Sequence, residues 1–170
     1  MNDVKDAKLN PLKQFWDRLD DHGTVMLGSP APDQPMQPMA ANGAREEGLI
    51  WFYTRKDTDL AQAANSGGRV QMCLMDEGRD YYAAVVGQLD IDHSERHIER
   101  YWNAVEDAVY SDGRQDPQLT MLKFAPETAS VWVGTGNPVK FGWELARSTI
   151  SGKEPNLGFS TQFGFQQNGA

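Results

Sequence analysis

The sequence predicts a mainly β protein, a small antiparallel β-barrel with helical insertions. Six or seven short apolar runs follow one another at close spacing and are separated by turn signals. Most connections are too short for the crossovers that parallel strands need, and two other stretches have helical periodicity. A chain of 170 residues with 39% hydrophobic content can bury a sizeable core. We therefore expect a single domain over residues 1–147, followed by a polar, glycine-rich tail over residues 148–170 whose order the sequence leaves open.

The first predicted helix begins after Asn10, because an asparagine side chain can cap a helix N-terminus and Pro11 suits the first turn. It ends near Gly23, and the β-branched and apolar residues 24–29 predict the first strand. One face of this helix carries the apolar side chains of Leu12, Phe15, Trp16 and Leu19.

A β-hairpin is predicted to organise the barrel. Its first strand, residues 34–41, contains Pro35 and Pro38, which remove hydrogen-bond donors from the ladder and favour an edge position. The dipeptide Asn42-Gly43 supplies turn chemistry, and residues 49–54 form the returning strand. This arrangement would pair the two strands directly with each other.

The returning strand is continuously apolar and aromatic until it ends in Thr54, Arg55 and Lys56. Backbone amides, a hydroxyl and positive charge at the end of a strand can be presented to an anion. The sequence therefore predicts an anion-binding site at this point of the chain.

The remaining elements follow in short order. Asp57 or Thr58 can cap a short helix, and Gly87 interrupts a long strand over residues 81–91, which suggests a bulge or a close approach of the backbone. Asp92 and Glu95 have the spacing of a capping box. The helix that they open has a predicted buried stripe of Ile98, Tyr101, Trp102, Val105 and Val109, and the other predicted strands are residues 69–75, 119–124 and 129–133, the last two separated by a turn over residues 125–127.

Composition excludes several classes of function. The formal net charge of −8 and the pI near 4.8 oppose nonspecific binding to nucleic acid or to an anionic membrane. No window approaches the roughly 20 apolar residues that a membrane span needs, and the N-terminus lacks the apolar core of a signal peptide, so we expect a cytoplasmic protein. The single cysteine, Cys73, is interpreted as a small buried hydrophobic residue.

Familiar catalytic and metal-binding motifs are absent from the sequence. Residues 134–136 form a lone GxG, and Gly152-Lys153 lacks the earlier glycine of a nucleotide-binding loop. His93 and His97 lie one helical turn apart, but no third ligand has suitable spacing, so we expect no metal. No histidine forms a recognisable nucleophile-base arrangement with a serine or cysteine.

The aromatic residues divide into core and site candidates. Trp51, Phe52 and Tyr53 are adjacent on a strand, so alternate side chains face opposite sides and one or two of them are expected in the core. Trp132 ends a strand and precedes a Gly-Thr-Gly-Asn-Pro run that is typical of a binding loop. Core packing and a functional role both remain open for Trp132.

Several ordered motifs resemble those of the general stress protein 26 group, in the pyridoxamine 5′-phosphate oxidase-like, FMN-binding split-barrel superfamily. The resemblance covers residues 12–133, most of the chain. It implies a six-stranded antiparallel split barrel and a homodimer with two FMN molecules at the subunit interface. The motifs are, in order, PMQPMAANG, GLIWFYTRKDT, RVQMCLM, YYAAVVGQLDI, HIERYWN, SDGRQDPQLTMLKF and ASVWV.

The resemblance also implies roles for individual residues. The strand Gln37-Pro38-Met39-Ala40 would lie along the isoalloxazine ring, with main-chain groups of Met39 and Ala40 at its polar edge. Tyr53 and Thr54 would bracket the ribityl phosphate, and Thr58 matches a hydroxyl position of the phosphate loop. Tyr82 falls where oxidases of the superfamily use a glutamine, and Trp132 matches a tryptophan that reaches the flavin.

The chain departs from the family pattern at basic positions. Gln37 stands where members usually have arginine, and Asp59-Leu60 replaces an Arg-Lys pair of the oxidases. Arg55, Lys56 and Arg69 are the candidates to replace these charges near the phosphate. The substrate residues of true pyridoxamine 5′-phosphate oxidases are not recognisable near the C-terminus, so vitamin B6 is not the expected substrate.

Three functions remain open at this point. The first is an FMN-dependent oxidoreductase of unknown substrate, in which the flavin supplies the redox chemistry and no side chain is needed as acid or base. The second is a noncatalytic, stress-related binding module with weak or lost flavin binding, which the missing basic positions favour. The third is a relative that uses another cofactor, deazaflavin or haem.

Overall fold

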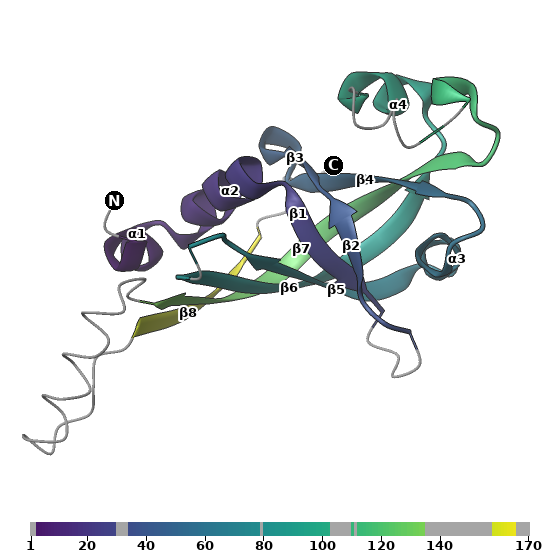
Figure 1. The fold of residues 1–170 in the computed structure, drawn as a ribbon. Coiled ribbons are helices and arrows are strands. Elements are labelled where there is room, and N and C mark those ends of the chain that lie inside the picture. Colours follow the sequence, from purple (N-terminus) through teal and green to yellow (C-terminus); the bar gives the residue numbers. More distant parts are fainter. Residues whose placement is uncertain are drawn as a thin grey trace, which may run out of the picture.

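The structure of the chain, a computed structural model, describes residues 3–29, 34–78, 80–102, 110, 112–134 and 158–165. The described part is a curved, wholly antiparallel sheet with helices at its ends and on one side (Figure 1). This confirms the predicted class, a mainly β split barrel with few helices, although the described sheet has eight strands where six were expected. In chain order the elements are α1 (Asp3–Leu9), α2 (Pro11–His22), β1 (Thr24–Gly28), β2 (Gln37–Ala40), β3 (Asn42–Ala44), β4 (Leu49–Arg55), α3 (Asp59–Asn65), β5 (Gly68–Met75), β6 (Tyr81–Asp92), α4 (Glu95–Tyr101), β7 (Leu119–Gly134) and β8 (Gly158–Gly164), with short 3₁₀ turns at Arg45–Glu47 and Gly113–Gln115.

The two edges of the curved sheet are joined by a single residue. The strand order is β2-β1-β5-β6-β7-β4-β3, so β2 and β3 lie at opposite edges although only Ala41 separates them in the chain. The backbone N–H of Ala41 donates to the carbonyl oxygen of Gly23 at 2.6 Å, which anchors this corner. The chain thus bridges the edges of the sheet and partly closes the barrel.

The predicted hairpin is wrong in its pairing and in its turn. Strand β2 pairs with β1, not with β4, and the short strand β3 is the partner of β4. The true turn is the 3₁₀ segment Arg45–Glu47, which ends at Gly48 with a left-handed φ of 67°. The edge position expected from the prolines is confirmed, since in the described residues β2 pairs with β1 alone.

Helix α2 forms as its sequence predicts. The Asn10 side chain accepts a hydrogen bond from the backbone N–H of Lys13 at 3.3 Å, and Gly23 caps the C-terminus with a left-handed φ of 61°. Phe15, Trp16 and Leu19 are buried and form the main core together with inward-facing residues of the strands. The helix therefore closes one face of the sheet.

Strand β7 shows that the turn predicted over residues 125–127 is wrong. Residues 125–127 do not form a turn, because β7 is one continuous strand of 16 residues. The register with β6 shifts between Val86 and Gly87, and Glu127 is the extra residue opposite this step. The proline at position 126 belongs to this bulge, where a missing N–H is tolerated. The bulge or close approach expected at Gly87 is confirmed.

Helix α4 begins later than predicted. Its N-cap is Ser94, and the Asp92 carboxylate accepts a hydrogen bond from the Ser94 backbone N–H at 2.8 Å instead of forming a capping box. Ile98, Tyr101 and Trp102 pack against a second cluster on β4 and β7 that contains Trp51, Tyr53 and Met121. The predicted stripe residues Val105 and Val109 lie outside the described residues.

The C-terminal segment contributes a strand that the sequence analysis did not assign. Strand β8 pairs with residues 128–134 of β7. Phe163 and Phe165 reach back to α2, with ring centroids 6.4 and 5.2 Å from that of Phe15. Within the predicted tail, residues 158–164 form this strand.

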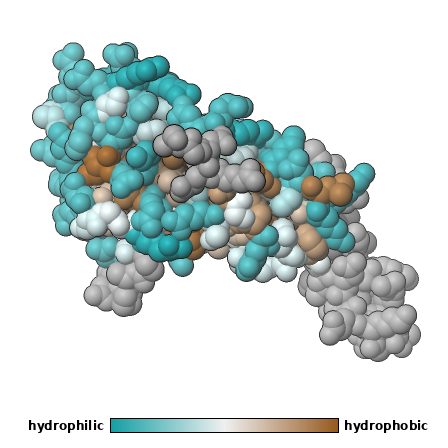
Figure 2. All heavy atoms as spheres, turned by 180° about the vertical axis from the view of Figure 1, so that it is seen from behind, coloured by the Kyte–Doolittle hydropathy of each residue, from teal (hydrophilic) through white to brown (hydrophobic). Residues whose placement is uncertain are grey.

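The surface is mainly hydrophilic, in keeping with the acidic composition. Figure 2 shows the molecule from behind, with apolar residues reaching the surface in separate patches. None of the helices in the described part of the chain has the length and hydrophobicity that a membrane crossing requires.

A partly buried ion pair joins α2 to the β5–β6 connection. Asp76 is 2% exposed, and its carboxylate accepts hydrogen bonds from Arg18 at 2.9 Å and from the backbone N–H groups of Asp80 and Tyr81 at 3.1 Å each. Burial raises the pKa of Asp76, but the hydrogen bonds from Asp80 and Tyr81 and the charge of Arg18 outweigh it and hold the pKa below its usual value. The pair holds this connection against the helix.

We predict that replacing Asp76 with asparagine removes a pH-dependent share of stability. The loss at pH 7 should be about 2–4 kcal/mol, because the change leaves the largely buried Arg18 guanidinium without its main carboxylate. A lowered carboxyl pKa contributes stability above the unfolded pKa of about 3.9 and loses it as the pH falls through the folded value. Urea unfolding at pH 7 and at pH 3 should therefore show that the difference between the Asp76→Asn variant and the unmodified protein shrinks at the lower pH. A constant difference would contradict the ionic origin of the effect.

We also predict that Gly87→Ala is strongly destabilising. An added Cβ would lie 2.3 Å from the Ala125 carbonyl oxygen and 2.8 Å from the Phe124 ring, so the bulge has to shift. The expected loss is about 2–4 kcal/mol in chemical denaturation. Gly164→Ala is the matched control, because its Cβ would meet only the Glu127 carbonyl oxygen at 3.7 Å. Equal effects of the two changes would show that the contact at Gly87 is not the cause.

Candidate functional site

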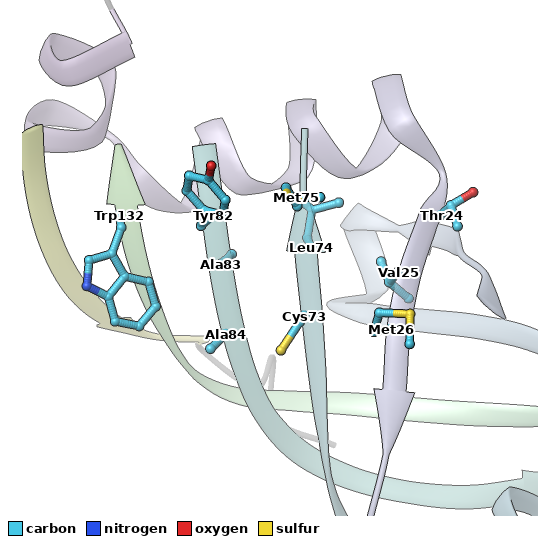
Figure 3. A pocket seen from close by; sticks show the side chains of 10 residues that line it. All are labelled: Thr24, Val25, Met26, Cys73, Leu74, Met75, Tyr82, Ala83, Ala84 and Trp132. Carbon is cyan, nitrogen blue, oxygen red and sulfur yellow. The ribbon is translucent and has the colours of Figure 1, made fainter. Parts of the chain in front are cut away.

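Exposed apolar side chains gather on the side of the sheet that faces away from α2. Met75, Tyr82 and Trp132 are direct cross-strand partners on β5, β6 and β7, and they are 59%, 38% and 49% exposed. Partner residues of neighbouring strands point to the same side of a sheet, so the three side chains form one row. Figure 3 shows this row with α2 passing behind the strands.

A second row lies beside the first. Met26, Cys73 and Ala84 are cross-strand partners on β1, β5 and β6. The two rows line a hollow of about 550 Å³, and we call this surface the apolar face. Its lining consists of Thr24, Val25, Met26, Cys73, Leu74, Met75, Tyr82, Ala83, Ala84 and Trp132.

The interpretation of Cys73 as a buried core residue is wrong. Met72 and Leu74 take the core positions on β5, and strand alternation places Cys73 between them on the apolar face, where it is half-buried. Desolvation by its apolar neighbours raises the pKa of the Cys73 thiol, so the uncharged thiol prevails at neutral pH. The residue therefore adds to the apolar character of the face.

Strand β2 divides its predicted site residues between two sides. Pro38 and Ala40 are exposed and pair with Met26 and Thr24, so they extend the apolar face to the edge of the sheet. Gln37 and Met39 pair with the buried residues Leu27 and Val25 and point to the core side. Met39 packs partly buried against the main core.

Strand β4 likewise separates Tyr53 from Thr54. The Tyr53 side chain lies under α4, where its hydroxyl donates to the Ile98 carbonyl oxygen at 2.6 Å. Thr54 is 7% exposed and points to the core side with Phe52. The two side chains therefore do not converge on one ligand atom.

A group of threonines marks the end of β4, and we call it the hydroxyl end. The hydroxyls of Thr54 and Thr58 lie 3.1 Å apart, and Thr58 caps α3 by accepting from the Ala61 backbone N–H at 3.3 Å. Thr120, which the sequence analysis missed, is the cross-strand partner of Thr54. Its hydroxyl oxygen is buried and has no hydrogen-bond partner among the described residues.

The basic candidates near the hydroxyl end are engaged within the chain. Arg55 donates to the Asp57 carboxylate at 3.3 Å and lies 3.8 Å from that of Asp116. Lys56 donates to the Pro117 carbonyl oxygen at 2.6 Å. Arg69 lies on β5 and pairs with Glu127 at 2.8 Å. The cations predicted to bind an anion thus already have acceptors.

The two groups of predicted site residues lie far apart in one chain. Thr54 is opposite Thr120, and Tyr82 is opposite Trp132, near the two ends of β7. Twelve positions of extended strand correspond to about 40 Å along the strand path. The two groups are therefore well separated along the strand path.

A flavin fits one part of this arrangement better than the other. The apolar face, with an exposed tryptophan and tyrosine, suits a planar tricyclic ring. The hydroxyl end has hydroxyl groups that suit a ribityl chain, whereas its cations are occupied by carboxylates and carbonyl oxygens. The residues thus offer more to the ring and the sugar-alcohol chain than to a terminal phosphate.

No metal site is evident in the described residues. The described part of the chain contains no group of three or more His, Cys, Asp or Glu side chains that could hold a metal ion. Instead, His97 pairs with the Asp92 carboxylate and its ring lies 4.5 Å from that of Trp51. The hydrogen bond to Asp92 and the packing on Trp51 therefore explain the position of His97, the second histidine of the pair noted in the sequence.

Sequence reasoning missed Met26 and Met75 as surface residues of the site. Period-two alternation in β1 and β5 contains this information, because the neighbours Val25, Leu27 and Leu74 are the core residues. The exposure of Trp132, left open by the sequence, is decided by the structure.

Comparison with known proteins gives the family. The pyridoxamine 5′-phosphate oxidase-like family matches residues 10–156, whereas no curated protein matches the sequence. A structure from Jannaschia sp. CCS1 named for general stress protein 26 is 31% identical, with 94% of this chain and 99% of that chain covered and a TM-score of 0.74. The general stress FMN/FAD binding protein of Xanthomonas citri is 33% identical, with 72% of this chain and 87% of that chain covered and a TM-score of 0.66.

A more distant structure shares the fold alone. PhzG from Burkholderia lata 383 is 11% identical, with 96% of each chain covered and a TM-score of 0.57. The ordered motifs, the curved antiparallel sheet and the two similar stress-protein structures agree with one another. The chain therefore belongs to the pyridoxamine 5′-phosphate oxidase-like family, in its general stress protein 26 group.

Proposed function

We propose that this protein binds a flavin, FMN in the first instance, between two copies of the chain and acts as a flavin-dependent oxidoreductase of unknown substrate. The observation that carries the proposal is the apolar face, where Met75, Tyr82 and Trp132 remain exposed in the single chain. A relative that is 33% identical is described as an FMN/FAD binding protein. The bound flavin would supply the redox chemistry, and the protein would bury and orient its ring.

The distance between the two groups of site residues supports a shared site. The hydroxyl end of one copy can approach the apolar face of the other, whereas the two lie about 40 Å apart along β7 within a copy. An exposed apolar face is also the kind of surface that a second subunit buries. A homodimer would thus complete the site and cover this face.

A second candidate function is a noncatalytic binding module. It is favoured by the contacts of Arg55 with Asp57 and of Lys56 with Pro117. Side chains held in these contacts would bind an anionic cofactor with lower affinity. Turnover assays with nicotinamide donors and common electron acceptors separate the two functions, since a module would bind flavin without turning over.

We predict that the purified protein binds FMN and that Trp132→Ala weakens this binding at least fivefold. The loss follows from the removal of an exposed ring that would pack against the flavin, an interaction worth about 1 kcal/mol or more. Quenching of flavin fluorescence during titration measures the affinity, and Trp132→Phe should restore most of it. A colourless protein that neither quenches FMN fluorescence nor gains thermal stability from FMN would refute the proposed function.

We further predict a dimer of about twice the 19.0 kDa chain mass in sedimentation velocity. Met75→Asp should weaken the dimer at least tenfold, because it places a charge in the row of Met75, Tyr82 and Trp132. Leu9→Asp is the matched control, since Leu9 is 72% exposed on α1, away from this face. A monomer at micromolar concentration that still binds FMN would contradict a shared site.

A further inference from the structure

We infer that the site does not select for the phosphate of FMN, so that the protein binds riboflavin about as tightly as FMN. This inference rests on the proposed flavin-binding function and concerns the hydroxyl end of the site. A phosphate dianion needs hydrogen-bond donors and positive charge. The groups that the sequence singles out for this task are Thr54, Arg55, Lys56 and Thr58.

The guanidinium of Arg55 faces carboxylates. Its Nε donates to Asp57 at 3.3 Å, and its Nη1 lies 3.8 Å from a carboxylate oxygen of Asp116. A phosphate would have to displace at least one of these carboxylates or accept it as a neighbour, and like charges repel. The positive charge of Arg55 is therefore largely compensated before any ligand arrives.

The amine of Lys56 is held in a different way. It donates to the Pro117 carbonyl oxygen at 2.6 Å, while the Lys56 backbone N–H donates to the Gln118 carbonyl oxygen at 2.8 Å. Both contacts tie Lys56 to the segment that leads into β7. The residue thus connects this segment to the end of β4, and binding a phosphate would need the ammonium to turn from this contact or to share its remaining protons.

The two hydroxyls already use their protons within the chain. Thr58 donates its single hydroxyl proton to the Arg55 carbonyl oxygen at 2.9 Å and accepts from the Ala61 backbone N–H. The Thr54 hydroxyl, 3.1 Å from that of Thr58, must therefore be the donor in their contact. What remains at Thr54 is a pair of acceptor positions, which suits an alcohol and disfavours a phosphate oxygen.

The acidic residues around the hydroxyl end also disfavour a phosphate dianion. Asp59 stands at the first position of α3, two residues after Asp57, and both Asp57 and Asp116 lie beside Arg55. A terminal hydroxyl of riboflavin can donate a hydrogen bond to a carboxylate, whereas the fully ionised phosphate of FMN has no proton to donate. Binding energy would then come from the ring on the apolar face and from the hydroxylated chain, which both flavins share.

The test is a pair of titrations at the same ionic strength. Riboflavin and FMN are titrated into flavin-free protein, and the dissociation constants are obtained from fluorescence quenching. We expect the two constants to agree within about fivefold, whereas a single uncompensated arginine on the phosphate would favour FMN at least tenfold. An FMN affinity more than fivefold above that of riboflavin overturns the inference and leaves the flavin-binding function intact. Failure of both flavins to bind overturns the function itself.

A charge-release variant tests the cause. Asp57→Asn removes the closer carboxylate from Arg55, and Asp57 is exposed, so the fold should tolerate the change. FMN affinity should rise about three- to tenfold while riboflavin affinity stays within twofold. Asp90→Asn on β6 is the matched control, because it removes the same charge beside Lys123, away from the hydroxyl end. An equal gain for both flavins, or for both variants, would contradict the role assigned to Arg55.

Discussion

The paired strands β6 and β7 are the constraint on which the rest of the structure depends. They are the longest strands of the described sheet, with 12 and 16 residues, and every other strand except β2 pairs with one of them or with a direct neighbour. Two straight strands of this length would not curve enough to let β2 and β3 meet through one residue. The extra residue Glu127, opposite the step between Val86 and Gly87, supplies a local bend and added twist.

This pairing also distributes the candidate site. It carries Tyr82 and Trp132 at one end and Thr120, the partner of Thr54, at the other. The two ends have different chemistry, since one is apolar and aromatic and the other consists of hydroxyls and compensated charges. In the proposed dimer, a ligand with an aromatic ring and a hydroxylated chain would meet one of these ends from each copy.

The acidic composition has consequences beyond solubility. Carboxylates hold several of the basic side chains near the strand ends, as in the pairs Arg55 with Asp57 and Arg69 with Glu127. Such pairs on an exposed surface contribute little to stability individually. Their larger effect is on recognition, because a compensated cation attracts an anionic ligand weakly.

Local patterns recovered most strands and helix α2, and they failed where one signal has two structural meanings. The residues Ala125-Pro126-Glu127 are typical of a turn, yet they also fit a bulge, and only the facing Gly87 distinguishes the two. Asn42-Gly43 is a common turn signal, but the chain continues there as β3 and turns at Gly48. Strand β8 was missed because its phenylalanines fill a core provided by Phe15 and other residues distant in sequence.

The sequence by itself determined the fold class, the family resemblance, the edge position of the proline-bearing strand and the helix cap at Asn10, because these depend on local backbone chemistry and on side-chain periodicity. Only the tertiary structure decided which distant partners Arg55 and Lys56 have, because Asp116 and Pro117 reach them from a segment some sixty residues away. It also decided that Met26, Met75, Tyr82 and Trp132 share one exposed face, since cross-strand register is set by pairing and not by order along the chain.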